Sequence, residues 1–152
     1  MFWAVPGVGS QRSTPVLNQS TNAYSRESTL TPESVDDWFE WHADIVLDHG
    51  EYSVYSLPSN PRIEIELRVS ELNSEHLDIL TMLLDQYTFY SNRREFSIVN
   101  GLSKKGVSSG TVISGEKQRG QELVTVFDNT DYRTKGIDEL SFSASIRFRK
   151  LQ

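Results

Sequence analysis

The C-terminal segment constrains the fold more than any other part of the chain. Its apolar residues, Leu140, Phe142, Ala144, Ile146 and Phe148, alternate strictly with three serines and then with Arg147 and Arg149. Successive side chains of a β-strand point to opposite faces, so this pattern predicts a strand with one buried and one wet face. Such strands are typical of antiparallel sheets. The chain is therefore expected to be mainly β.

Other segments add strands to this sheet. The run from Arg62 to Val69 alternates as cleanly, with Ile63, Ile65, Leu67 and Val69 on one side. Weaker strand patterns cover residues 51–57, 96–99, 111–113 and 123–127, and a glycine-punctuated loop is expected between the second and third of these. No internal repeat is visible.

Two helices are expected. Thr31, Pro32 and Glu33 form a helix-start signature, and apolar residues then recur at helical spacing, which predicts a helix over 32–48. The aromatic residues within 37–42 also suit a strand. A stripe of leucines ending at Tyr87 predicts a second helix over 74–90, with an apolar face wide enough to cover a sheet.

These elements predict an α+β fold dominated by antiparallel pairing: a β-sandwich or half-barrel flanked by one long helix. The chain divides into an extended N-terminal arm, 1–30, and a β domain, 31–152. The arm is rich in Ser, Thr, Asn and Gln and shows neither the helical period of 3.6 residues nor the strand period of 2. Such a segment cannot form a core of its own, so we expect it to pack on its own domain or on a neighbouring subunit. Its candidate contact residues are Trp3, Val5, Val16, Leu17 and Tyr24.

Composition excludes several kinds of site. The 152 residues include no cysteine, so neither a disulfide nor a thiolate zinc site is possible. A net charge of −6 disfavours a nucleic-acid-gripping role, because phosphate binding needs an excess of Lys and Arg. No membrane-spanning run and no secretory signal are expected, so we place the chain in the cytosol or in a particle assembled there.

Catalytic, metal and cofactor sites are not expected. The histidines His42, His49 and His76 lack metal-ligand spacing, and Asp36, Asp37, Glu40 and Asp44 are interpreted as a solvated helix face. The segment 110–117 has glycines like a phosphate-binding loop, but Glu116 occupies the position that needs a lysine. A small enzyme using the acidic cluster remains the least favoured alternative.

Two surface features remain open. Trp3, Trp38 and Trp41 could form an aromatic platform for a sugar or a receptor, but we favour the simpler interpretation that Trp38 packs in the core and Trp3 anchors the arm. Lys104, Lys105, Lys117 and Arg119 are expected to be solvated loop charges that could contact an acidic neighbour. Trp41, Lys104, Lys105, Arg119, Arg147 and Arg149 complete the candidate interface residues.

The order of elements from Gly50 to Leu151 resembles the tail-tube-like domain of tailed bacteriophages, most closely minor tail-tip and distal-tail proteins. The resemblance is carried by the Gly-Glu-Tyr-Ser turn, the strand 63–69, the predicted helix 75–90, a strand from Phe96 and the final Ser-Ile-Arg-Phe-Arg strand. It implies a structural virion protein of the tail tube, tail tip or baseplate. Copies would join edge to edge in a homo-oligomeric ring and contact other tail proteins, while DNA passes through the channel without specific binding. The resemblance further implies assembly in the host cytoplasm, no membrane contact and no cofactor.

Overall fold

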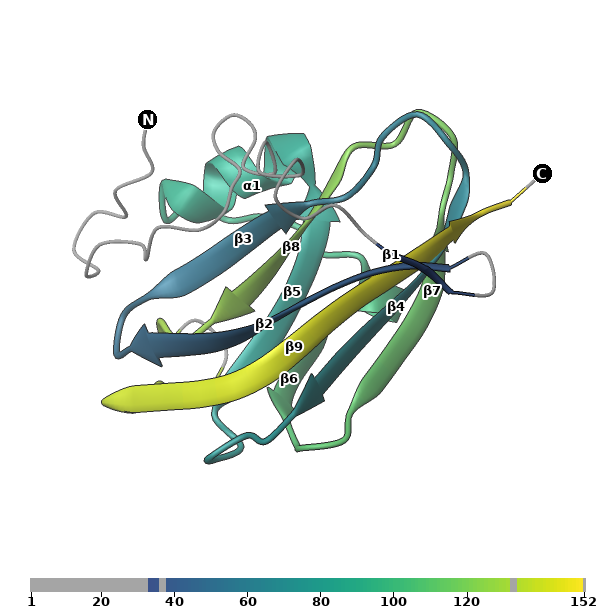
Figure 1. Cartoon of the computed structure of the whole chain (residues 1–152). Coiled ribbons are helices and arrows are strands. Elements are labelled where there is room, and N and C mark those ends of the chain that lie inside the picture. Colours follow the sequence, from purple (N-terminus) through teal and green to yellow (C-terminus); the bar gives the residue numbers. More distant parts are fainter. Residues whose placement is uncertain (1–32, 36–37, 132–133, 152) are drawn as a thin grey trace.

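The computed structural model describes residues 33–35, 38–131 and 134–151, which form two antiparallel sheets packed face to face (Figure 1). The five-stranded sheet has the order β1 (Glu33–Val35), β2 (Trp38–Asp48), β9 (Glu139–Lys150), β4 (Ile63–Ser70) and β7 (Val112–Lys117). The four-stranded sheet has the order β3 (Tyr52–Ser56), β8 (Leu123–Asp128), β5 (Leu77–Leu83) and β6 (Lys104–Val107). The helix α1 (Leu84–Ser91) follows β5, and a short 3₁₀ turn, η2 (Asn100–Leu102), precedes β6.

The main core lies between the two sheets. In β9 the apolar residues of the alternating pattern face inward, and register places Ala144 opposite Ala43 of β2 and Val69 of β4. The burial of β4 alternates in the same way, as its sequence predicts. Burying one face of each strand in this layer removes apolar surface from water, which is the main force that holds the sandwich together.

Three strands of the four-stranded sheet, β3, β5 and β8, are buried on both faces. The outer face of this sheet carries Tyr52, Val54, Leu80, Met82, Val124 and Val126, and α1 covers these residues with Tyr87 and Tyr90. Figure 1 shows α1 lying across the β3, β8 and β5 side of the sandwich. All six residues of β8 are consequently buried. The expected α+β sandwich flanked by a helix is confirmed; the expected arm lies outside the described residues.

The helix predicted over 32–48 is wrong, because this segment forms β1 and β2. Trp41, Ala43, Ile45 and Leu47 point to the core at a period of two, not 3.6. Pairing with β9 over ten residue pairs, from Phe39↔Phe148 to Asp48↔Glu139, decides the outcome. The aromatic and β-branched residues that made the sequence ambiguous favour a strand once such a partner is present.

The helix predicted over 74–90 is wrong in its first half. Residues 77–83 form β5, which pairs with both β8 and β6, and the helix covers only 84–91. Because β5 is buried on both faces, its sequence lacks alternation and reads like a buried helix. The expected long helix is therefore a short one, with Leu83 extended at its N-cap.

The remaining differences concern the segment after α1. Residues 96–99 do not form the expected strand, although the amide of Val99 donates to the carbonyl of Thr81 at 2.7 Å. The loop expected around Gly106 instead contains β6, a short strand that pairs with β5 through a register shift. Within the described residues, no helix is both long and apolar enough to cross a membrane.

Candidate functional site

A layer of buried tyrosines and aspartates lies under α1. The hydroxyl oxygens of Tyr52 and Tyr87 lie 3.1 Å apart, and Tyr90 donates a hydrogen bond to the Oδ2 atom of Asp128. The ring of Tyr52 meets those of Tyr87 and Tyr90 edge on, with centroids 6.3 and 5.2 Å away. Burial raises the pKa of all three phenols, so they remain protonated donors.

Asp128 is completely buried at the end of β8. Its Oδ1 atom accepts hydrogen bonds from the amide and hydroxyl of Thr130, at 2.8 and 2.9 Å. Burial raises the pKa of this carboxyl to about 6, even though the hydrogen bonds from Tyr90 and Thr130 oppose the shift. Asp78, its register partner on β5, raises it further through charge repulsion. Asp128 is a saturated structural carboxyl that does not reach solvent.

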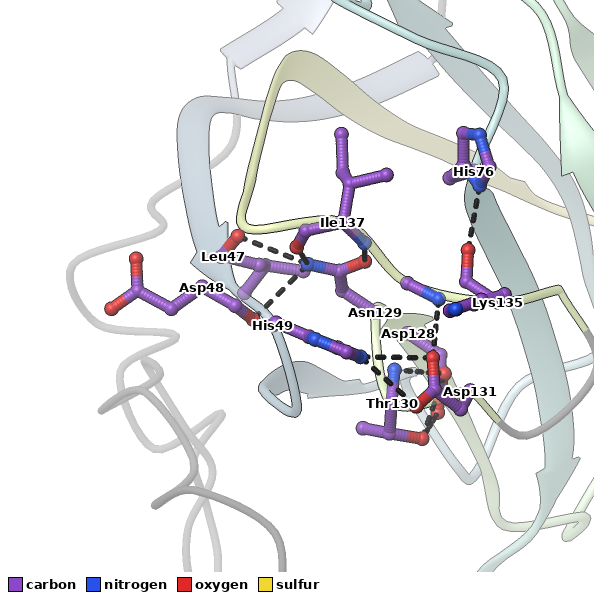
Figure 2. A network of polar contacts seen from close by, with 11 residues as sticks. Leu47, Asp48, His49, His76, Asp128, Asn129, Thr130, Asp131, Lys135 and Ile137 are labelled. Atoms are coloured by element: carbon purple, nitrogen blue, oxygen red, sulfur yellow. Dashed lines mark hydrogen bonds and ion pairs between the residues drawn. The ribbon is translucent and has the colours of Figure 1, made fainter.

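Asn129 joins the two sheets at this end of the sandwich (Figure 2). Its Nδ2 atom donates to the carbonyls of Leu47, Asp48 and Ile137, at 3.2, 3.1 and 2.9 Å. Its Oδ1 atom accepts from the amide of Ile137 at 3.0 Å. Because one buried side chain satisfies backbone groups at the end of β2 and in the β8–β9 connection, it fixes both segments together.

Asp131 lies beside Asn129, and Figure 2 shows it facing His49. The Nε2 atom of His49 is 2.9 Å from both carboxylate oxygens, and the amide of Gly136 donates to Oδ1 at 2.5 Å. The Gly136 amide, followed by His49, holds the pKa of Asp131 below its usual range. Asp131 has a φ of 70°, a left-handed conformation that Asp adopts more readily than most residues. His76 has a separate partner, the carbonyl of Lys135 at 2.6 Å.

A hollow of about 410 Å³ opens next to this network. Tyr90, Phe96 and Thr130 line it together with Arg93, Arg94, Glu95 and Asp131. Tyr90 and Phe96 contact each other edge on, with ring centroids 5.2 Å apart. The hollow thus combines an aromatic floor with a charged rim.

The outer face of the five-stranded sheet carries a ladder of ion pairs. Arg147 binds Glu66 at 2.7 Å and lies 3.9 Å from Glu40, and Arg149 binds Glu64 at 2.8 Å. The two guanidinium carbons also lie 4.6 and 4.8 Å from the ring centre of Trp38. Arg147 and Arg149, predicted as interface residues, are therefore already engaged within the chain.

The predicted sugar platform is not assembled in the described part of the chain. Trp41 points inward and packs against Tyr55, with ring centroids 4.5 Å apart. Trp38 lies on the opposite face of the same sheet, under the two arginines. The two tryptophans therefore cannot form one platform.

The predicted basic residues are dispersed. Lys104 and Lys105 are exposed on β6, and Arg119 is exposed in the turn between β7 and β8. The expectation of a solvated Lys117 is wrong, because this residue is completely buried. Its Nζ atom donates to the carbonyls of Ser59, Pro61 and Gln118 at 2.8, 2.9 and 2.9 Å, and burial lowers its pKa.

The described members of the acidic cluster are not arranged as a catalytic or metal site. Glu40 and Asp44 belong to the wet face of β2, where Asp44 accepts a hydrogen bond from Ser143 at 2.5 Å. Over residues 33–35, 38–131 and 134–151, no group of three or more His, Asp or Glu could hold a metal ion. Asp36, Asp37, Trp3, Val5, Val16, Leu17 and Tyr24 lie outside the described residues.

Sequence reasoning missed the network around Asp128, Asn129 and Asp131. A usable signal was present, because the polar run 128–131 directly follows a strand that is apolar except for Thr125. A polar residue at the end of a buried strand must find hydrogen-bond partners, which makes it a candidate for such a junction.

Comparisons with known proteins define no family: no protein-family model and no curated protein matches the chain. The solved structures with similar arrangements include the periplasmic inhibitor of g-type lysozyme PliG from Aeromonas hydrophila. PliG is 6% identical with a TM-score of 0.46, over 77% of this chain and 92% of that one.

Two further structures show weaker likeness. A chain of the acid-stable capsid of Helicobacter pylori bacteriophage KHP30 is 12% identical, with a TM-score of 0.42 over 77% of this chain and 89% of that one. A chain of the disulfide-linked pili of Bacillus endospore appendages is 14% identical, with a TM-score of 0.37 over 75% and 89%. Likeness this weak transfers no residue and no role to this chain.

Proposed function

We propose that this chain is a structural virion protein of a bacteriophage tail. In this proposal copies join through sheet edges into a ring, and neighbouring tail components bind to that ring. DNA passes through its channel without specific binding, consistent with a net charge of −6. The role is structural and not catalytic, and assembly takes place in the host cytoplasm. The edge of β7, beyond which no described strand lies, supports the edge-to-edge assembly in this proposal. The assignment to a tail rests on the resemblance in element order, of which the strand at 63–69 and the final strand are present in the structure, whereas the long helix and the strand from Phe96 are not.

The direction of the backbone groups of β7 follows from two hydrogen bonds. The amide of Leu151 donates to the carbonyl of Arg62. The backbone N–H and C=O groups of residue 62, and of every second residue after it, therefore point toward β9. The amide of Val69 donates to the carbonyl of Thr111. The backbone groups of the odd-numbered residues of β4 therefore point toward β7. Register then pairs Leu67 with Ile113, which turns the N–H and C=O groups of the even-numbered residues of β7 outward.

Those outward residues are Val112, Ser114 and Glu116, and all three are exposed. Val112 alone is 51% exposed. Among the described strands none lies beyond β7 in the sheet. An exposed row of unpaired backbone groups can accept a strand from another chain.

One of the two terminal strands of the other sheet, β6, is protected against such pairing. Its register is shifted, Lys104 and Lys105 project charge, and Asp78 accepts the amide of Gly106 at 2.8 Å. Bulges and lysines are the usual protection of an edge. In β7 the charged side chains lie at the C-terminal end: Glu116 pairs with Arg62 at 2.9 Å, and the buried Lys117 is turned inward. Val112 and Ser114 leave the rest of the edge uncharged.

The substitution Ser114→Pro tests the edge. The amide of Ser114 faces outward, so proline removes a donor for strand addition and leaves the β4–β7 ladder intact. We expect wild-type oligomers in native mass spectrometry, and monomers for Ser114→Pro at the same protein concentration. Ser114→Ala, the matched control, should assemble normally.

A monomeric wild-type chain at high concentration would refute assembly itself. Normal oligomers of a folded Ser114→Pro chain would refute the β7 edge. Deleting residues 1–30 tests the arm separately: we propose that it lies on a neighbouring subunit, so the truncated chain should fold and fail to assemble.

A further inference from the structure

We propose that the hollow at the C-terminal end of α1 binds a carboxylate of an acidic polypeptide segment, through Arg93 and Arg94. This inference is independent of ring formation, since it concerns a site within one copy. It rests on backbone geometry, on unpaired charge and on a rigid aromatic floor.

The helix end shows that Arg93 occupies an unfavourable position. The amide of Arg94 donates to the carbonyl of Phe89 at 2.9 Å and the amide of Arg93 to that of Tyr90 at 3.1 Å. This is the Schellman arrangement, whose left-handed residue is usually glycine. Arg93 fills that position with a φ of 60°, a conformation that disfavours a residue with a Cβ atom. Stability alone would select glycine there, so an arginine points to another role.

The two guanidinium groups are available to a ligand. Arg93 and Arg94 are exposed, and neither forms an ion pair in the described part of the chain. Asp131, the carboxylate on the same rim, is already bound by Gly136 and His49. A planar guanidinium presents paired N–H donors that match a carboxylate.

The floor of the hollow is fixed from below. Tyr90 and Thr130, which line it, both donate to the buried carboxyl of Asp128. Phe96 packs edge on against Tyr90, and it is only partly buried. A preformed apolar floor with a few polar groups at the rim is typical of ligand sites, and 410 Å³ is within their usual range. An apolar side chain next to the bound carboxylate fits this floor.

The charges around the hollow favour a carboxylate over a polyphosphate. Glu95 and Asp131 stand on the same rim as the two arginines, and the chain as a whole carries −6. A strand of phosphates would meet these negative charges repeatedly, whereas one or two carboxylates can bind between them. We therefore infer a protein partner with an acidic, aromatic-containing segment.

The test is a titration of the full-length chain, followed by amide chemical shifts. The probes are the capped peptide acetyl-Glu-Phe-Glu-amide, its neutral counterpart acetyl-Gln-Phe-Gln-amide, inorganic phosphate and a single-stranded oligonucleotide. We expect the acidic peptide to change the amide chemical shifts of Arg93, Phe96 and Thr130. Its affinity should fall as the salt concentration rises. The neutral peptide should bind at least about tenfold more weakly, because it offers no charged acceptor to the two arginines. Phosphate and the oligonucleotide should also bind at least about tenfold more weakly, because phosphate has no apolar side chain for the floor and a run of phosphates meets Glu95 and Asp131.

Two substitutions separate binding from folding. Arg93→Gly should raise the thermal midpoint, since glycine suits the left-handed position, and yet lower peptide affinity about tenfold. Arg94→Gln should lower affinity with no change in midpoint. Arg119→Gln removes the same charge elsewhere and should leave affinity unchanged.

The proposal is overturned if the folded Arg93→Gly and Arg94→Gln variants bind the acidic peptide as the wild type does. Equal or tighter binding of the oligonucleotide would overturn the choice of a protein partner. A loss of affinity in Arg119→Gln equal to that in Arg94→Gln would reduce the effect to net charge, and would also overturn it.

Discussion

Tyr90 of α1 donates a hydrogen bond to Asp128 of β8 in a layer where both residues are buried. The contact ties the helix to the sheet beneath it. It also places a carboxyl with a raised pKa in the interior, so the stability of this layer depends on pH.

The carboxyl of Asp128 should destabilise the fold as pH rises. Its pKa is about 6 in the folded chain and 3.8 as a free model group, so the folded state favours the protonated form. Its contribution is fully present below about pH 4 and is lost as pH rises through 6, a change of about 3 kcal/mol. Urea unfolding of wild type and Asp128→Asn between pH 4 and 7 measures it.

In that comparison the stability of the wild type relative to Asp128→Asn should decline with rising pH, because Asn cannot ionise. Carboxylates shared by both chains cancel in the difference. Parallel stability curves across this range would contradict the raised pKa.

Gly136→Ala should be strongly destabilising. A Cβ atom at this position would lie 2.4 Å from the carbonyl oxygen of Asn129 and 2.6 Å from its Oδ1 atom. Neither atom can move without loss of the Asn129 hydrogen bonds, so we expect a cost of about 2–3 kcal/mol in denaturant unfolding. Gly101→Ala is the matched control, because its Cβ meets nothing within 4 Å. Similar stabilities for the two variants would show that the junction relaxes readily.

Glu66→Gln tests the ion-pair ladder. Glu66 accepts hydrogen bonds from Arg147 at 2.7 Å and Arg68 at 2.8 Å, with its side chain only 17% exposed. Burial raises its pKa, but these two arginines outweigh that effect and hold the pKa below its usual range. We expect the variant to lose about 1–2 kcal/mol at neutral pH.

The pH dependence of this loss has a defined sign. A lowered folded pKa stabilises the chain above the unfolded pKa, and the benefit disappears as pH falls through the folded value. The wild type and Glu66→Gln should therefore converge in acid. Glu116→Gln, in a pair whose side chains are 38% and 47% exposed, should change stability by less than about 0.5 kcal/mol. If Glu116→Gln destabilised the chain as much as Glu66→Gln, burial would not explain why the Glu66 ion pairs contribute more.

Sequence patterns predicted the strands that have one wet face. β4 and β9 alternate because one side of each meets the core and the other meets solvent or ion pairs. The strand predicted over 123–127 is confirmed as β8. In these segments local pattern and tertiary environment agree, and the fold class followed from them.

The secondary-structure predictions are wrong where tertiary contacts override the local sequence pattern. Residues 77–83 look helical because α1 buries the second face of β5. Residues 38–48 become a strand because β9 supplies a long partner. The hollow, the left-handed Arg93 and the inward Lys117 depend on three-dimensional placement that no spacing rule encodes.

The double burial of three strands in the four-stranded sheet distributes the freedom to change sequence unequally between the two sheets. On β9 every second position faces outward and can vary as long as its charge partners do, whereas β8 offers no such position. Substitutions that adapt the chain to a new neighbour should therefore fall on the outward-facing side chains of the five-stranded sheet, on the edge strand β7 and on the residues around the hollow beside α1. In the opposite layer the buried strands β3, β5 and β8 tolerate little change.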